Sequence, residues 1–97
     1  MLTGKQKRYL RSLAHHLDPI FQIGKGGVSD QMVRSIQEAL EARELIKVSV
    51  LNNAQDDART IAPELAQKTG AELVQVIGKT IVLYKESKEN KIIELPR

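Results

Sequence analysis

The stretch IFQIGKGGVSDQMVRSIQEALEARELIKVSVL, residues 20–51, predicts a strand, a glycine loop, a helix and a second strand in succession. Ile20–Ile23 is a short apolar run that ends at glycines, and Asp30–Arg43 carries apolar residues at helical spacing. Leu45–Leu51 alternates apolar with polar residues, which indicates a strand with one buried face. Strands separated by a helix form a parallel crossover, so this stretch predicts part of an α/β sheet.

The helix of this stretch has a predicted start and two distinct faces. Ser29 precedes it as an N-cap, and Val28 and Val33 stand at the positions of a hydrophobic staple. Its predicted buried stripe consists of Met32, Val33, Ile36, Ala39 and Leu40. Its predicted water-facing residues are Arg34, Glu38 and Glu41.

Residues 3–17 predict a helix with one core face and one cationic face. Thr3 and Gln6 have capping-box spacing, and Asp18-Pro19 closes the segment. The apolar face is formed by Tyr9, Leu10, Leu13, Ala14 and Leu17. The opposite face carries Arg8, Arg11 and His15, flanked by Lys5 and Lys7.

The second half of the chain predicts a third helix and a hairpin. Asn52-Asn53 forms a turn that can cap the helix, which runs to about Thr69 and ends at Gly70. Pro63 inside it predicts a kink or a late restart, because proline removes a backbone hydrogen bond. Residues 72–77 and 80–85 predict two strands joined by a Gly78-Lys79 turn.

Residues 86–97 are predicted to form a mostly polar tail, with Ile92, Ile93 and Leu95 as its only apolar contacts to the domain. The expected order is α-β-α-β-α-β-β. It predicts a single α/β domain over residues 1–97 with a mixed four-stranded sheet covered by helices.

Composition excludes several classes of function. The chain of 97 residues has no cysteine, so it offers neither a disulfide nor a thiolate zinc site. The apolar run Ile81–Tyr84 is far too short to cross a membrane, and the N-terminus has no apolar signal region. His15-His16 diverge on a helix and make a poor metal pair. We therefore expect a cytoplasmic, monomeric protein with no catalytic site, metal, cofactor or membrane partner.

The glycine loop is the first candidate binding element. It consists of Gly24, Lys25, Gly26 and Gly27. Glycines let a phosphate approach the backbone, and the following helix start adds free N–H groups and a positive dipole end. A GxxG loop that clamps a nucleic-acid backbone is an established recognition device. The alternative is a tight turn with positive φ angles, although a plain turn gains nothing from a cation between the glycines.

The charge is concentrated in the first third of the chain. Residues 1–34 carry six lysines and arginines against two aspartates, a net charge of +4, while the remainder has a net charge of −1. A localised basic patch suggests a polyanion partner, although charge runs are usually only solvated surface. The three aromatic residues, Tyr9, Phe21 and Tyr84, are predicted to be core, which argues against recognition by base stacking.

Gly78-Lys79-Thr80 imitates the end of a Walker A motif, which would suggest a small nucleotide-dependent enzyme. The motif's first glycine would fall on Leu73, and a strand follows instead of a helix. A hairpin turn is the better interpretation.

Three segments in order resemble the CRM domain, named for chloroplast RNA splicing and ribosome maturation, and its bacterial single-domain YhbY-like group. They are LTGKQKRYLRSLAHHLDPIFQIGKGGVSD, ALEARELIKVSVL and TGAELVQVIGKTIVLYK. The resemblance implies an α/β fold similar to the C-terminal domain of translation initiation factor 3. It also implies a role in RNA binding: plant members assist intron splicing, and bacterial members are linked to assembly of the large ribosomal subunit.

The resemblance assigns the family's GxxG loop and basic first helix to matching positions here. With the basic residue of the second helix, the predicted RNA-binding residues are Lys5, Lys7, Arg8, Arg11, Gly24, Lys25, Gly26, Gly27 and Arg34. We expect the first helix and the loop to form one electropositive surface that binds large-subunit ribosomal RNA or pre-ribosomal particles. The alternative is a protein-interaction module on the ribosome or an assembly factor, without direct RNA contact.

Overall fold

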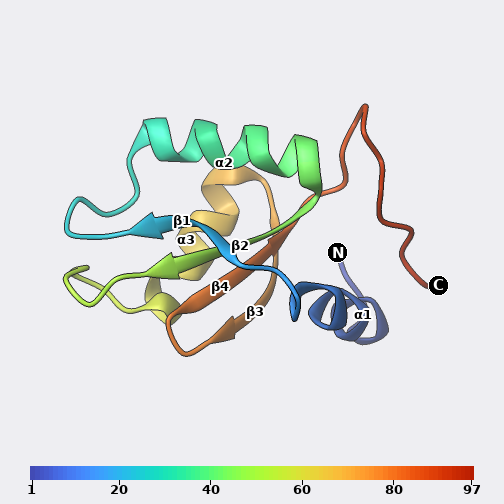
Figure 1. The fold of residues 1–97 in the computed structure, drawn as a ribbon, viewed down its shortest axis with the longest axis horizontal. Coiled ribbons are helices and arrows are strands. Elements are labelled where there is room, and N and C mark those ends of the chain that lie inside the picture. The colour runs from blue at the N-terminus through green and yellow to red at the C-terminus, as the bar shows by residue number, and fades with distance from the viewer.

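A four-stranded mixed sheet lies between helices in the computed structural model, which describes residues 1–97 (Figure 1). The elements in chain order are α1 (Gly4–Ala14), β1 (Pro19–Ile23), α2 (Asp30–Arg43), β2 (Leu45–Val50), α3 (Ala58–Thr69), β3 (Glu72–Ile77) and β4 (Thr80–Tyr84). The strands follow the spatial order β1-β2-β4-β3; β1 and β2 are parallel, and the other pairs are antiparallel. The predicted α/β fold with a mixed four-stranded sheet is confirmed.

Alternation along β2 sorts the core into two clusters, one on each face of the sheet. Ile46, Val48 and Val50 belong to the larger cluster, which α2 and α3 cover with residues such as Ile36 and Leu65. The smaller cluster joins the other face to α1 and consists of Leu10, Ala14, Leu45, Val74, Val82 and Tyr84. Because helices cover both faces of the sheet, Leu45 and Ile46 at the start of β2 are both buried although they point to opposite faces.

The central β-α-β unit has the predicted elements, although the predicted stripe of α2 is fully buried only at Ile36 and Leu40. Ile23 at the end of β1 pairs with Val50 at the end of β2. The hydroxyl of Ser29 caps α2 by accepting a hydrogen bond from the N–H of Met32 at 3.1 Å. Capping and the apolar stripe therefore determine the start and the buried face of this helix.

The first helix is shorter than its sequence predicts. The capping box of Thr3 and Gln6 is present, but α1 ends at Ala14 instead of residue 17. Residues 15–18 connect α1 to β1, which begins at Pro19. Because a residue before proline favours extended backbone, Asp18 does not continue the helix. The prediction that Tyr9 and Leu17 are core residues is wrong, since they are 38% and 37% exposed.

The third helix begins later than predicted and is not interrupted. Asp57, not Asn52-Asn53, is its N-cap and accepts a hydrogen bond from the N–H of Thr60 at 2.9 Å. The helix continues through Pro63 without interruption. Pro63 has no N–H to donate to the carbonyl of Arg59, four residues earlier in the helix. Both residues are exposed, so water can hydrate that carbonyl instead.

The hairpin between β3 and β4 has the predicted two-residue turn. Ile77 pairs with Thr80, and Gly78 adopts a φ of 56°, a conformation that favours glycine. Gly78-Lys79-Thr80 is therefore a strand-to-strand turn rather than a phosphate loop that leads into a helix.

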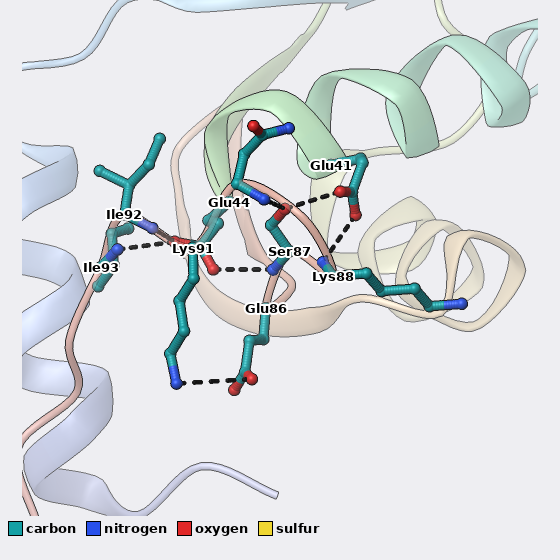
Figure 2. Close-up of polar contacts among 9 residues, drawn as sticks. Glu41, Glu44, Glu86, Ser87, Lys88, Lys91, Ile92 and Ile93 are labelled. Carbon is teal, nitrogen blue, oxygen red and sulfur yellow. Dashed lines mark hydrogen bonds and ion pairs between the residues drawn. The ribbon is translucent and has the colours of Figure 1, made fainter.

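The last residues form no helix or strand but are held by two glutamates, as Figure 2 shows. Glu44 follows α2 and is fully buried. Its carboxylate accepts hydrogen bonds from the backbone N–H groups of Ser87, Ile92 and Ile93 at 2.8, 2.6 and 2.7 Å. It does so from a φ of 67°, which is unusual for a residue other than glycine.

Glu41 provides the second anchor, although its sequence pattern predicted a water-facing residue. Its carboxylate accepts hydrogen bonds from the Ser87 hydroxyl and from the N–H groups of Lys88 and Glu89. Glu41 lies one turn before Glu44 at the end of α2, so the two carboxylates hold one loop of chain between them.

Apolar contacts hold the remainder of this C-terminal segment. Ile93 and Leu95 pack against the cluster beneath α1, and the carbonyl of Pro96 accepts a hydrogen bond from the Gln6 side chain at 3.0 Å. The side chain of Ile92 instead stays 67% exposed. Two of the three apolar residues that the sequence singled out are therefore in contact with the domain.

We expect the anchoring of the C-terminal segment to weaken in acid. Burial by itself raises the pKa of Glu44, but the N–H groups of Ile93, Ser87 and Ile92 together lower it below its ordinary value. The Lys88 N–H, followed by the Ser87 hydroxyl, lowers the pKa of Glu41. A lowered folded-state pKa stabilises the fold above the unfolded value of 4.5, and this stabilisation is lost as pH falls through the folded value.

The melting temperature should therefore fall steeply below pH 4.5 in the wild-type protein. It should depend less on pH in a Glu41→Gln/Glu44→Gln variant, which lacks both carboxylates. Circular dichroism melts across the acid range measure this difference. Parallel curves for the two proteins would show that other carboxylates cause the acid response.

Candidate nucleic-acid interface

The loop between β1 and α2 contains three glycines with different structural roles. The N–H of Gly27 donates to the carbonyl of Gly24 at 3.0 Å and closes the turn. Gly27 has a φ of 68°, so the turn itself favours glycine at this position. A Cβ at Gly24 would lie 3.3 Å from the Asn53 side-chain oxygen, so the neighbouring loop restricts this position as well.

Gly26 differs from the other two because the fold does not need a glycine there. Its φ is not positive, and an added Cβ would meet no atom within 4 Å. The space in front of this residue is open, and a backbone without a side chain lets another molecule approach closely. The fold does not account for a glycine at position 26, whereas the close approach of a ligand to the backbone would account for it.

The surroundings of the loop carry charges of both signs. A small hollow separates the glycines from the loop that precedes α3, and Asp56 and Glu64 are among its lining residues. These carboxylates disfavour an anion in the hollow. Lys25 also lines this hollow; it is exposed and forms no ion pair, so its cation is available to a ligand of the loop.

The start of α2 adds backbone donors to the same place. Ser29 caps the N–H of Met32, whereas the N–H groups of Asp30 and Gln31 donate no hydrogen bond within the protein. Arg34 is exposed one turn further along the helix and forms no ion pair. The loop, the first turn of α2 and Arg34 form the first candidate contact, which we call the loop site.

The cations of α1 form a second candidate contact. Lys5, Arg8 and Arg11 are exposed, and Lys7 is half-buried. The ion pairs of the structure are Met1–Glu72, Lys68–Glu64 and Lys91–Glu86, so no carboxylate neutralises a cation of this helix. An unneutralised row of cations on one helix attracts a polyanion.

The sequence predicted that these two contacts form one patch, but the structure keeps them apart. The loop site follows Ile23, which pairs with Val50, whereas α1 packs on Leu45 at the other end of β2. These two ends of β2 are about 17 Å apart at the usual rise of a strand. Figure 1 accordingly places the loop and α1 toward opposite ends of the molecule. The apolar stripe of α1 predicts that the helix packs, but not at which end of the sheet.

Lys47 on β2 is a further candidate contact residue, which the sequence pattern does not indicate. Its alternation with apolar residues indicates only a strand position that faces away from the main core. The pairing of Lys47 with Val82, and of Val82 with Gln75, places Lys47 and Gln75 on the sheet face that α1 partly covers. The sequence of one strand does not show which residues of other strands will lie beside it, so the neighbours of Lys47 could not be predicted.

Other chemistry is not suggested by the arrangement of side chains. No group of three or more histidine, aspartate or glutamate side chains is placed to hold a metal ion. None of the helices has the length and apolar character needed to cross a membrane. The fold and the two cationic contacts instead define a small α/β domain that presents a glycine loop and a basic helix on one sheet.

This chain belongs to the CRS1/YhbY (CRM) domain family, whose model matches residues 2–85. It is 69% identical over 96 residues to the "Probable RNA-binding protein YqeI" of Bacillus subtilis, with 99% of this chain and 100% of that protein covered. An "RNA-binding protein" of Haemophilus influenzae is 41% identical, with 99% and 96% covered. The family resemblance seen in the sequence is therefore confirmed.

A solved structure and a plant protein extend the comparison. The solution structure of a hypothetical protein from Staphylococcus aureus matches with a TM-score of 0.82 and 66% identity, covering 99% of this chain and all of that one. The chloroplast CRS2-associated factor 1 of maize is 29% identical over 89% of this chain, which corresponds to only 13% of the plant protein. The same domain thus occurs as most of a small bacterial protein and as a small part of a larger plant protein.

Proposed function

We propose that this chain is a non-enzymatic RNA-binding protein that binds structured large-subunit ribosomal RNA in the cytoplasm, as a monomer, during ribosome assembly. The observation that carries the proposal is Gly26, a glycine that the fold does not require, at an open position beside an unpaired lysine. The names of the bacterial relatives support RNA as the partner. The family resemblance of the sequence supports the ribosomal context.

At the loop site, a phosphate would contact the backbone at Gly26 and receive N–H donors from the first turn of α2. Free N–H groups and the helix dipole favour an anion there, and Lys25 adds a full positive charge. The carboxylate of Asp30 lies in the same turn and opposes binding in part, so the cation of Lys25 is needed to keep the site favourable.

The cations of α1 would contact phosphates at a distance from the loop. Contacts of this kind contribute affinity and orientation without reading sequence. Among the tyrosine and phenylalanine side chains only Tyr9 is exposed, at 38%, so the protein offers no row of such rings on which bases could stack. The protein should therefore recognise the shape and backbone of a folded RNA.

The direct test is fluorescence anisotropy of a labelled, deproteinised large-subunit ribosomal RNA fragment at several salt concentrations. Binding should weaken with salt, with a log-log slope of about 0.7 to 0.9 for each phosphate neutralised. Absence of binding at low salt would refute the proposed function.

A Lys5→Gln/Arg8→Gln variant should bind this RNA several-fold more weakly at about 0.1 M salt, because it loses two phosphate contacts. Its salt slope should decrease by about 1.4 to 1.8. The matched control is Lys68→Gln/Lys91→Gln, which removes the same charge from residues outside α1 that already have carboxylate partners. Equal losses for the two variants would mean that only net charge matters.

One observation favours the alternative of a protein-interaction module. A groove of about 670 Å³ lies where α1 ends, beside the C-terminal segment, and most of its lining is apolar. Leu17, Ile20 and Ile92 line it and are among the exposed large apolar residues of the structure. Leu17→Ser should weaken association with a pre-ribosomal particle under this alternative, while leaving affinity for deproteinised RNA unchanged.

A further inference from the structure

A second groove, of about 330 Å³, lies between α1 and the part of the sheet that α1 leaves uncovered. Its polar lining comes from two places far apart in the sequence: Arg11, Ser12 and the C-cap residue His15 at the end of α1, and Lys47 and Gln75 on β2 and β3. We call this feature the sheet groove. From the sequence, Arg11 belongs with the other cations of α1, and Lys47 and Gln75 have no predicted function.

Backbone geometry explains why these side chains converge. Arg11 and His15 are one helical turn apart and are neighbours on the surface of α1. Lys47 and Gln75 lie on the same face of the sheet with β4 between them, about 10 Å apart at the usual strand spacing. A helix edge and two strands thus enclose one polar recess.

The charge in the sheet groove has one sign. None of its lining residues is a carboxylate, and neither Arg11 nor Lys47 takes part in an ion pair. Lys47 is half-buried, and its cation has no anionic partner in the protein. An anion bound in the groove would supply that partner, and the Gln75 amide could donate to one of its oxygens.

The position of the sheet groove connects the two separated contacts. Lys47 lies between Leu45, which packs against α1, and Val50, which pairs with the residue before the glycine loop. It is about 10 Å from that end of β2 at the usual strand rise. The paired residues Gln22 and Ser49 continue the same polar sheet face toward the loop.

We propose that the sheet groove binds a backbone phosphate of the RNA, held by Arg11, His15 and Lys47, so that one strand passes from α1 across the sheet face to the loop site. The proposal rests on the proposed function, because it assumes an RNA partner. RNA is favoured over an acidic protein segment because the groove has a single sign of charge and continues between two other phosphate contacts.

The test compares Lys47→Gln with Lys68→Gln, which removes the same charge from the opposite side of the sheet. With the labelled ribosomal RNA fragment, Lys47→Gln should lower affinity several-fold at about 0.1 M salt and reduce the salt slope by about 0.7 to 0.9. Lys68→Gln should stay close to the wild-type protein. Equal affinities and slopes for the two variants would overturn the proposal.

A second measurement keeps the test valid if Lys47→Gln lowers the melting temperature. In the wild-type protein, titration with the same RNA should shift the backbone amide NMR signals of Lys47 and Gln75. If those signals stay in place while the signals of Lys25 and Gly26 shift, the sheet groove is not a contact, although the proposed function stands. If the wild-type protein does not bind deproteinised RNA, the proposed function and the sheet groove as an RNA site both fail, and an acidic protein partner becomes the better explanation.

Discussion

Gly26→Asp is expected to weaken binding of the ribosomal RNA fragment at least about tenfold, by placing a carboxylate where a phosphate would approach the backbone. The fold should tolerate the substitution, because the new Cβ meets no protein atom and the backbone needs no positive φ at this position. The melting temperature should stay within about 4 °C of the wild-type value, as for other surface substitutions. Anisotropy titrations and thermal melts of the same samples measure both quantities.

The matched control for this variant is Asn52→Asp, which adds the same charge to an exposed residue of the neighbouring loop. It should reduce affinity much less than Gly26→Asp, because it does not occupy the space in front of the glycine backbone. If both variants lose the same affinity for RNA, the loop acts only through long-range electrostatics and does not contact the RNA backbone. A melting temperature that falls together with the affinity would mean that Gly26 is a structural glycine.

Glu44→Ala should destabilise the fold by about 3 kcal/mol or more, the largest stability effect that we expect for one substitution. The carboxylate accepts three backbone hydrogen bonds in a fully buried position, and its removal leaves those N–H groups without a partner. For a domain of this size, the loss corresponds to a fall in melting temperature of roughly 12 °C or more. Urea denaturation and thermal melts measure the free energy and the temperature.

Glu38→Ala is the matched control, because Glu38 is an exposed glutamate of the same helix. Its effect should stay within about 0.5 kcal/mol. Glu44→Gln should fall between the two, since its carbonyl can still accept hydrogen bonds from Ile92 and Ile93 while its amide faces the N–H of Ser87. If Glu44→Ala is no less stable than Glu38→Ala, the C-terminal segment contributes nothing to the stability of the domain.

Local patterns predicted the parts of this protein that depend on nearby residues. The bounds of α2, the Ser29 cap, the turn at Gly78 and the alternation of β2 were all visible, because capping, turns and periodicity act over a few residues. The errors occur where a segment meets the rest of the molecule. The end of α1, the start of α3 and the water-facing assignment of Glu41 are examples.

Local patterns were enough to predict the number of helices and strands, their order and the concentration of positive charge in the first third of the chain. They did not predict that α1 packs at the far end of the sheet from the glycine loop, that Lys47 shares a groove with Arg11, or that Glu44 holds the C-terminal segment. An amphipathic stripe, a strand cation or a buried carboxylate specifies only what kind of partner it needs. Which distant segment supplies that partner depends on the packing of the whole chain.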